Sequence, residues 1–136
     1  MKPAKVLLVD DEVELAEAIV QRLKIRRYAA RAAFSGAGAI AALQEEDPDV
    51  MIIDLYLQGM LGIDLARSVR RIRPEIVTIM LSGHGSSDAE RWISNGEIFD
   101  FVMKPVEIQQ LVQKIDRAKK EHDERQKRGV CGHARH

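Results

Sequence analysis

The chain has 136 residues, of which 46% are hydrophobic and 31% charged, as is ordinary for one soluble globular domain. Lys plus Arg and Asp plus Glu number 21 each, so no net basic charge indicates direct nucleic-acid binding. No apolar run approaches the length of about twenty residues that a membrane span needs, and the first run begins too early for a secretory signal. The single cysteine, Cys131, excludes an internal disulfide and favours a reducing, cytoplasmic environment.

Five short apolar runs predict β-strands. They cover residues 6–9, 28–34, 50–54, 76–81 and 99–103. The third run, Val50-Met51-Ile52-Ile53-Asp54, follows Asp47-Pro48-Asp49 and ends on a carboxylate. It is therefore expected to be a buried strand whose last residue emerges at an edge of the sheet.

Amphipathic segments between these runs predict five helices. The second is expected over residues 37–46, the fourth over residues 86–96, and the last from Lys104-Pro105 onward. The predicted inward faces are Ala16, Ile19, Val20 and Leu23 in the first helix, Gly62, Leu65, Ala66, Val69 and Ile72 in the third, and Ile108, Leu111, Val112 and Ile115 in the last.

Strands joined by crossover helices pair in parallel, so this alternation predicts an α/β fold. We expect a doubly wound, five-stranded parallel sheet of the flavodoxin-like (βα)5 type, with strand order 2-1-3-4-5 and helices on both faces. The pattern ends near residue 120, because the charged stretch at 119–128 shows no apolar stripe. Residues 1–120 are therefore predicted to form the domain, and residues 121–136 a charged linker or disordered tail.

Polar side chains collect where the predicted strands end. Asp10 and Asp11 follow the first strand, Asp54 ends the third, Ser82 follows the fourth, and Lys104 follows the fifth. Open parallel sheets bind ligands outside the carboxyl ends of their strands, where the strand order reverses. Three carboxylates would meet there, which is unfavourable unless a cation lies among them. Lys104 is one such cation, and Mg²⁺, which prefers oxygen ligands, is the other.

This set of groups favours phosphoryl transfer. It combines a nucleophilic carboxylate, a metal site, a hydroxyl donor and a lysine, and an aspartyl phosphate is a known type of covalent intermediate. The candidate catalytic residues are Asp54 as the phosphoacceptor, Lys104 and Ser82.

Four motifs in this order resemble the receiver domain of two-component response regulators, over roughly residues 4 to 120. They are Val6-Leu7-Leu8-Val9-Asp10-Asp11-Glu12, Asp49-Val50-Met51-Ile52-Ile53-Asp54, Ser82-Gly83 and Phe101-Val102-Met103-Lys104-Pro105. Each motif alone is weak, whereas all four at these spacings are specific. The resemblance implies a cytoplasmic signalling domain rather than an enzyme, in which Asp54 accepts a phosphoryl group from a sensor histidine kinase or phosphotransfer protein.

The resemblance also implies roles around Asp54. Asp11 would bind Mg²⁺ directly, Asp10 mainly through water, and Asp54 and the backbone carbonyl of Tyr56 would complete the protein ligands. Lys104 would pair with the phosphoryl oxygens, and the Lys104-Pro105 peptide bond would be cis.

A switch is implied in the same way. Ser82 would turn toward the new phosphoryl group, and Phe101 would rotate into the space that Ser82 leaves. The surface formed by the fourth helix, fifth strand and fifth helix would then signal to a downstream effector or output domain, and the resemblance allows a homodimer. Phosphorylation adds about −1.5 to −2 charge, so a charge-assisted hydrogen bond would bias a two-state element.

Two other functions remain open at this point. One is a receiver-like interaction module that works without phosphorylation; the complete set of site residues argues against it. The other is an enzyme on a similar sheet. A flavodoxin would need a phosphate-binding loop where this chain has Asp10-Asp11-Glu12, and a phosphatase of the haloacid dehalogenase type would need an acid where it has Tyr56.

Overall fold

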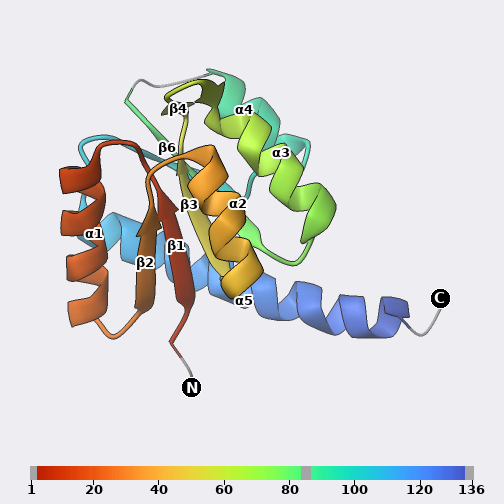
Figure 1. Ribbon diagram of the computed structural model, residues 1–136. Helices are drawn as coiled ribbons and strands as arrows, with labels where there is room; N and C mark the ends of the chain where they lie inside the picture. The colour runs from red at the N-terminus through yellow and green to blue at the C-terminus, as the bar shows by residue number, and fades with distance from the viewer. Residues whose placement is uncertain (1–2, 84–86, 134–136) are drawn as a thin grey trace.

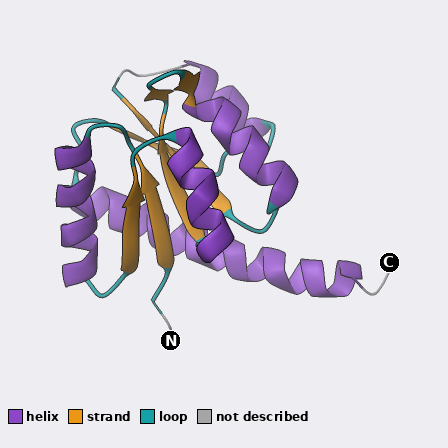
Figure 2. Ribbon diagram, viewed as in Figure 1, coloured by secondary structure: helices purple, strands orange, loops and turns teal. Residues whose placement is uncertain are grey.

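The computed structural model describes residues 3–83 and 87–133 and contains a five-stranded parallel sheet (Figures 1 and 2). Its strands, in chain order, are β1 (Lys5–Val9), β2 (Ala29–Ala33), β3 (Val50–Asp54), β6 (Val77–Ser82) and β7 (Asp100–Met103). Their spatial order is β2-β1-β3-β6-β7, which is 2-1-3-4-5 when only these five are counted. The predicted fold class and strand order are confirmed.

Five helices cover the sheet: α1 (Val13–Ile25), α2 (Gly36–Glu45), α3 (Gly62–Ile72), α4 (Ser87–Ser94) and α5 (Ile108–His133). In Figure 1, α1 and α5 lie on one face and α2, α3 and α4 on the other. The apolar core divides in the same way into two clusters, one under each set of helices. Successive residues of β1 point to opposite faces, so Val6 and Leu8 join the α1/α5 cluster, and Leu7 and Val9 join the other.

Most of the predicted inward faces are confirmed. The four apolar residues predicted for α1 are buried, and so are Leu111 and Ile115 of α5. The prediction for Ile72 is wrong: this last residue of α3 is 46% exposed, and Ile63, in the first turn, is buried instead. The final helix begins at Ile108 rather than at Lys104-Pro105.

A short hairpin follows β3 and was not predicted. Its strands, β4 (Tyr56–Leu57) and β5 (Met60–Leu61), pair in antiparallel fashion around Gln58 and Gly59. Gly59 has φ +83°, a left-handed conformation that glycine adopts without strain. Two-residue strands carry too little periodicity to be recognised in a sequence, so this segment was expected to be only a glycine-containing loop.

α5 continues as a helix beyond residue 120 to His133, and residues 134–136 of the expected linker or tail lie outside the described residues. This part of the helix has no apolar stripe because it packs through polar side chains. His122 is only 4% exposed, and Arg125 donates from Nη1 to the backbone carbonyl oxygens of Pro74 (3.3 Å) and Ile76 (3.1 Å). A linker role for residues 121–136 stays a prediction. Among residues 3–83 and 87–133, no helix is both long and apolar enough to cross a membrane.

Candidate functional site

The carboxyl ends of four strands bring most of the predicted site residues together. β1 pairs with β3 in parallel, with Val9 opposite Ile53, so the next residues along, Asp10 and Asp54, come from adjacent strands. The register of β6 with β3 and β7 places Leu81 opposite Asp54 and Ser82 opposite Met103. The order of the strands thus gathers residues that lie far apart in the sequence.

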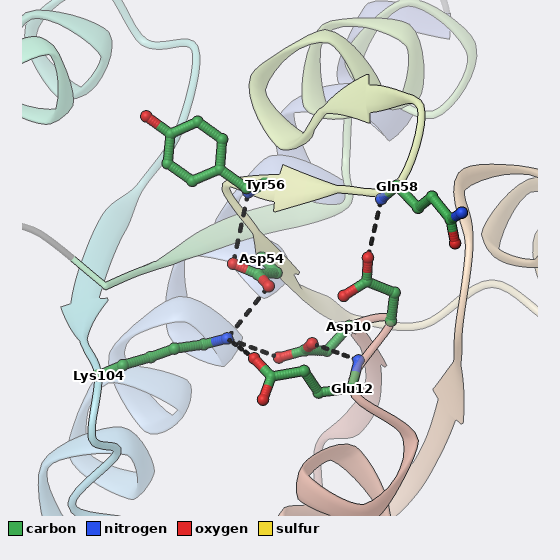
Figure 3. Close-up of polar contacts among 7 residues, drawn as sticks. Asp10, Glu12, Asp54, Tyr56, Gln58 and Lys104 are labelled. Atoms are coloured by element: carbon green, nitrogen blue, oxygen red, sulfur yellow. Dashed lines mark hydrogen bonds and ion pairs between the residues drawn. The ribbon is translucent and has the colours of Figure 1, made fainter.

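Lys104 lies at the centre of this group (Figure 3). Its Nζ is 3.1 Å from Asp54 Oδ2, 3.1 Å from Asp10 Oδ2 and 3.2 Å from Glu12 Oε1. Its backbone N–H donates to the carbonyl oxygen of Ser82 at 2.7 Å, which ties the residue after β7 to the end of β6. The Lys104–Pro105 peptide bond is cis. One ammonium group therefore contacts three carboxylates.

The electrostatic environment of Asp54 disfavours its charge. The residue is 6% exposed, and this burial raises the pKa of its carboxyl group. Lys104 lowers that pKa by hydrogen bonding, the negative charge of Asp10 raises it, and the net pKa lies above the ordinary value of 3.8. Burial lowers the pKa of Lys104 in turn, but its contacts with Asp54 and Asp10 outweigh burial and raise that pKa. The site carries more negative charge than its lysine offsets.

Asp10 and Glu12 complete an acidic group that suits a cation. Oxygen atoms of Asp10, Glu12 and Asp54 all lie within 4.8 Å of one another. Asp10 is fully buried; its Oδ1 accepts from the Glu12 N–H at 2.9 Å, while its Oδ2 has no hydrogen bond of normal geometry despite the nearby ammonium group. A buried carboxylate oxygen that lacks a hydrogen bond, beside two other carboxylates, fits the hard oxygen ligands that Mg²⁺ prefers.

Glu12 was not predicted as a site residue. In the sequence it is one more acid near the start of a helix, where acids are common. In the structure it is the N-cap residue of α1, and its side chain reaches Lys104, which is 92 residues away. Only the three-dimensional path of the β1–α1 turn reveals this contact.

Asp11 is not part of the same acidic group within the described residues. Its Oδ2 accepts a hydrogen bond from the Gln58 N–H at 2.8 Å, so this carboxylate holds the β4–β5 hairpin against the β1–α1 turn. The Tyr56 N–H lies 3.4 Å from Asp54 Oδ1, and the Tyr56 side chain is exposed. The roles of Asp11 and of the Tyr56 carbonyl as metal ligands stay predictions.

The two predicted switch residues lie beside the site. Ser82 is buried at the end of β6. Phe101 is half-buried and packs against the core cluster under α2, α3 and α4. Lys114 of α5 places its Nζ 5.5 Å from the centre of the Phe101 ring and donates to the Phe101 carbonyl oxygen at 2.8 Å. The aromatic side chain is thus in contact with α5 as well as with the core.

Gly62 is a second residue whose role near the site the sequence did not indicate. A Cβ atom at this position would lie 2.1 Å from the backbone carbonyl oxygen of Asp54, far inside van der Waals contact. The Gly62 N–H also donates to the Leu55 carbonyl oxygen at 2.6 Å. The start of α3 therefore packs directly on the backbone of Asp54, and only glycine fits there.

Comparison with known families agrees with this arrangement. The family model described as the response regulator receiver domain matches residues 6–116. The chain belongs to this family. It is a receiver domain of the two-component response regulators, and the strand-end acids, the buried Asp54 and the central lysine lie within the matched range.

Named relatives of this receiver domain are regulatory proteins. The transcriptional regulatory protein GlrR of Escherichia coli is 37% identical over 118 residues, which are 86% of this chain and 26% of GlrR. The transcriptional regulatory protein KdpE of Mycobacterium tuberculosis is 34% identical over 110 residues, which are 81% of this chain and 48% of KdpE. The chain thus spans about a quarter of one relative and half of the other.

A solved structure of similar size gives the same fold. The receiver domain of NtrX from Brucella abortus is 31% identical, with a TM-score of 0.78, and the match covers 85% of this chain and 98% of that one.

Proposed function

We propose that Asp54 of this receiver domain accepts a phosphoryl group from a sensor histidine kinase or a phosphotransfer protein. The observation that carries the proposal is the position of Lys104, whose ammonium group lies 3.1 Å from the buried carboxylate of Asp54. A carboxylate oxygen of Asp54 attacks the phosphorus, an O–P bond forms, and the P–N bond of the donor phosphohistidine breaks. The imidazole nitrogen leaves with the electron pair and takes up a proton from solvent.

Lys104 has two partners in succession in this proposal. Before transfer, its ammonium group offsets the charges of Asp10, Glu12 and Asp54. After transfer, it pairs with phosphoryl oxygens, because a group at this distance from the acceptor carboxylate is placed to stabilise charge that develops on them.

A magnesium ion would be held at the same acidic group. Asp10 and Asp54 provide the most buried oxygens, and Glu12 lies beside them; Asp11 and the Tyr56 carbonyl are assigned by family resemblance. When bound, Mg²⁺ would supply positive charge that lowers the repulsion between these carboxylates and an incoming phosphoryl group.

The signal would pass through Ser82 and Phe101 to the surface formed by α4, β7 and α5. Support comes from Phe101, which belongs to β7, packs in the core and contacts Lys114 of α5. A downstream effector, an output domain or a second copy of the chain would recognise this surface. The single Cys131 and the family resemblance favour a cytoplasmic setting.

The test is phosphorylation with acetyl phosphate and Mg²⁺, measured by intact mass. We expect the native chain to gain one phosphoryl group and Asp54→Asn to gain none. Asp123→Asn is the matched control, because the Asp123 side chain is 52% exposed on α5 and pairs with Lys119 rather than with Lys104; this variant should still be phosphorylated. If the folded native chain gains nothing, the domain is an interaction module that works without phosphorylation.

A further inference from the structure

His122 lies at the edge of the sheet opposite Asp54, where α5 passes the amino ends of the strands. It is 4% exposed, although it is in the part of α5 that has no apolar stripe. Its Nδ1 lies 2.8 Å from the backbone carbonyl oxygen of Glu75, in the turn before β6. Its Nε2 lies 3.1 Å from Oδ1 of Asp49, just before β3. One imidazole ring therefore contacts two connecting segments of the chain.

Both of these partners are hydrogen-bond acceptors. A neutral imidazole has one N–H donor and one nitrogen lone pair, whereas an imidazolium ion has two donors. Neutral His122 would have to point its lone pair either at the Glu75 carbonyl oxygen or at the Asp49 carboxylate. The contacts are satisfied together only when the ring is protonated.

The other charged groups around Asp49 and His122 form a balanced set. Asp49 Oδ2 accepts from the Lys5 N–H at 3.0 Å and lies 3.2 Å from Lys119 Nζ. Lys119 also pairs with Asp123 at 3.0 Å, on the following turn of α5. The Lys5 ammonium group is directed away, to Glu46 at 3.0 Å. Asp49 is thus held by three N–H donors, one of which belongs to His122.

The next turn of α5 is charged as well. Arg125 Nε pairs with Glu121 at 2.9 Å, and Arg128 Nη2 pairs with the same carboxylate at 3.2 Å. Arg125 also donates to the carbonyl oxygens of Pro74 and Ile76, which ties this turn of α5 to the chain just before β6.

Residues 119–129, the distal half of α5, are held to the domain by ion pairs and hydrogen bonds, and none of these described residues belongs to an apolar core cluster. Ala118 is the last α5 residue in the apolar core cluster. Beyond it, Lys119, His122 and Arg125 make the contacts with the domain. His122 is the most buried of the three, so loss of its positive charge should loosen this half of the helix and leave the apolar half in place.

We propose that His122 is a proton-dependent clamp that fastens the distal half of α5 to Asp49 and to the turn before β6. Burial lowers the pKa of His122, but the hydrogen bonds with Asp49 and the Glu75 carbonyl outweigh it, so the net pKa lies above the ordinary 6.5. The stabilisation is therefore fully present below 6.5 and is lost as the pH rises through the higher pKa of the folded protein. A rise in pH from neutral to alkaline therefore loosens the packing of the distal half of α5 on the domain.

The first test is an NMR titration of the histidine rings in the full chain. We expect the His122 ring to titrate above 6.5 and the Asp49→Asn variant to lower its midpoint. A midpoint at or below 6.5, or one that Asp49→Asn leaves unchanged, overturns the proposal. Because the chain has four histidines, His122→Gln identifies the signal.

The second test follows hydrogen exchange of the α5 amides as protection factors, from about pH 6 to about pH 9. Protection of residues 119–129 should fall about tenfold for each pH unit by which the measured His122 pKa exceeds its unfolded value. Strand amides that exchange through global unfolding should lose protection by no more than this factor, because global unfolding also releases His122. In His122→Gln the distal half should be weakly protected at every pH. Equal protection of the native distal half across this range overturns the proposal, and so does the same pH-dependent loss in His122→Gln.

Discussion

Asp49 immediately precedes β3 and Asp54 is its last residue, and the surroundings of the two carboxylates have opposite effects on their charge. The carboxylate of Asp49 accepts a hydrogen bond from the Lys5 N–H and pairs with Lys119 and His122. Burial raises the pKa of Asp49, but these donors outweigh it and hold that pKa well below the usual range. Asp54, at the other end, shares one lysine with Asp10 and Glu12, and its pKa is raised.

The difference separates a structural cluster from a reactive one. The Asp49 cluster pairs its carboxylate with three N–H donors, those of Lys5, Lys119 and His122, so the charge of Asp49 is offset within the fold. The Asp54 cluster has three carboxylates and one lysine to offset them, so a bound cation improves its balance of charge. Surplus charge in a buried site is unfavourable for folding and useful for chemistry.

The largest expected effect is the loss of stability when Asp49→Asn removes the carboxylate of the Asp49 cluster. Asp49→Asn leaves protonated His122 without its anion and Lys119 with the exposed Asp123 alone. We expect the free energy of unfolding near pH 6 to fall by about 2–3 kcal/mol. This is less than the loss for a fully buried pair, because water still reaches the edge of the cluster. Urea unfolding followed by circular dichroism measures it.

Asp54→Asn is the matched comparison for that measurement, since it removes a charge from the cluster with surplus acids. It should leave the free energy of unfolding unchanged or raise it. If the two variants destabilise the domain equally, the contrast between the clusters is wrong.

Removing Lys104 should unbalance the reactive cluster further. Lys104→Ala leaves three carboxylates together without their ammonium group, and we expect a loss of about 2 kcal/mol in magnesium-free buffer. Saturating Mg²⁺ should restore part of that loss, because the ion would bind the same oxygens. Thermal unfolding with and without Mg²⁺ tests this, with Lys119→Ala as the control that Mg²⁺ should not rescue.

The two aspartates should titrate on opposite sides of 3.8, the ordinary value. Carboxyl-carbon NMR in magnesium-free buffer should give Asp49 a lower midpoint and Asp54 a higher one, and each pH unit between them is a tenfold difference in ionisation. Asp49 therefore contributes stability that is present above 3.8 and lost as the pH falls through its own pKa. Protonation of Asp54 at low pH removes a repulsion instead. Midpoints in the reverse order would contradict the contrast.

The smallest effect concerns the exposed partner of Lys119. Asp123 pairs with Lys119 four residues earlier on the surface of α5, and its side chain is 52% exposed. Asp123→Ala should change the free energy of unfolding by about 0.5 kcal/mol or less, because water screens such pairs. A loss comparable with that of Asp49→Asn would mean that the helix surface, and not the buried carboxylate, stabilises this edge of the sheet.

Much of the reactive site could be predicted because it follows from where strands end. Parallel strands bring their carboxyl ends to one edge, so acids and a lysine directly after apolar runs are enough to place Asp10, Asp54 and Lys104 together. Glu12 could not be predicted, because its contact with Lys104 depends on the backbone path between β1 and α1. The same holds for Asp11, whose carboxylate binds the Gln58 N–H of a hairpin too short to show periodicity.

The sequence by itself determined the class of fold, the order of elements and the family, because apolar periodicity and motif spacing are local properties of the chain. Only the tertiary structure decided which side chains meet at the other end of the sheet, where the strands begin. His122 lies in a charged stretch whose pattern predicts a solvent-exposed tail, yet it is buried between Asp49 and the turn before β6. Its partners lie dozens of residues away in the chain, and contacts at that separation exist only once the sheet has assembled.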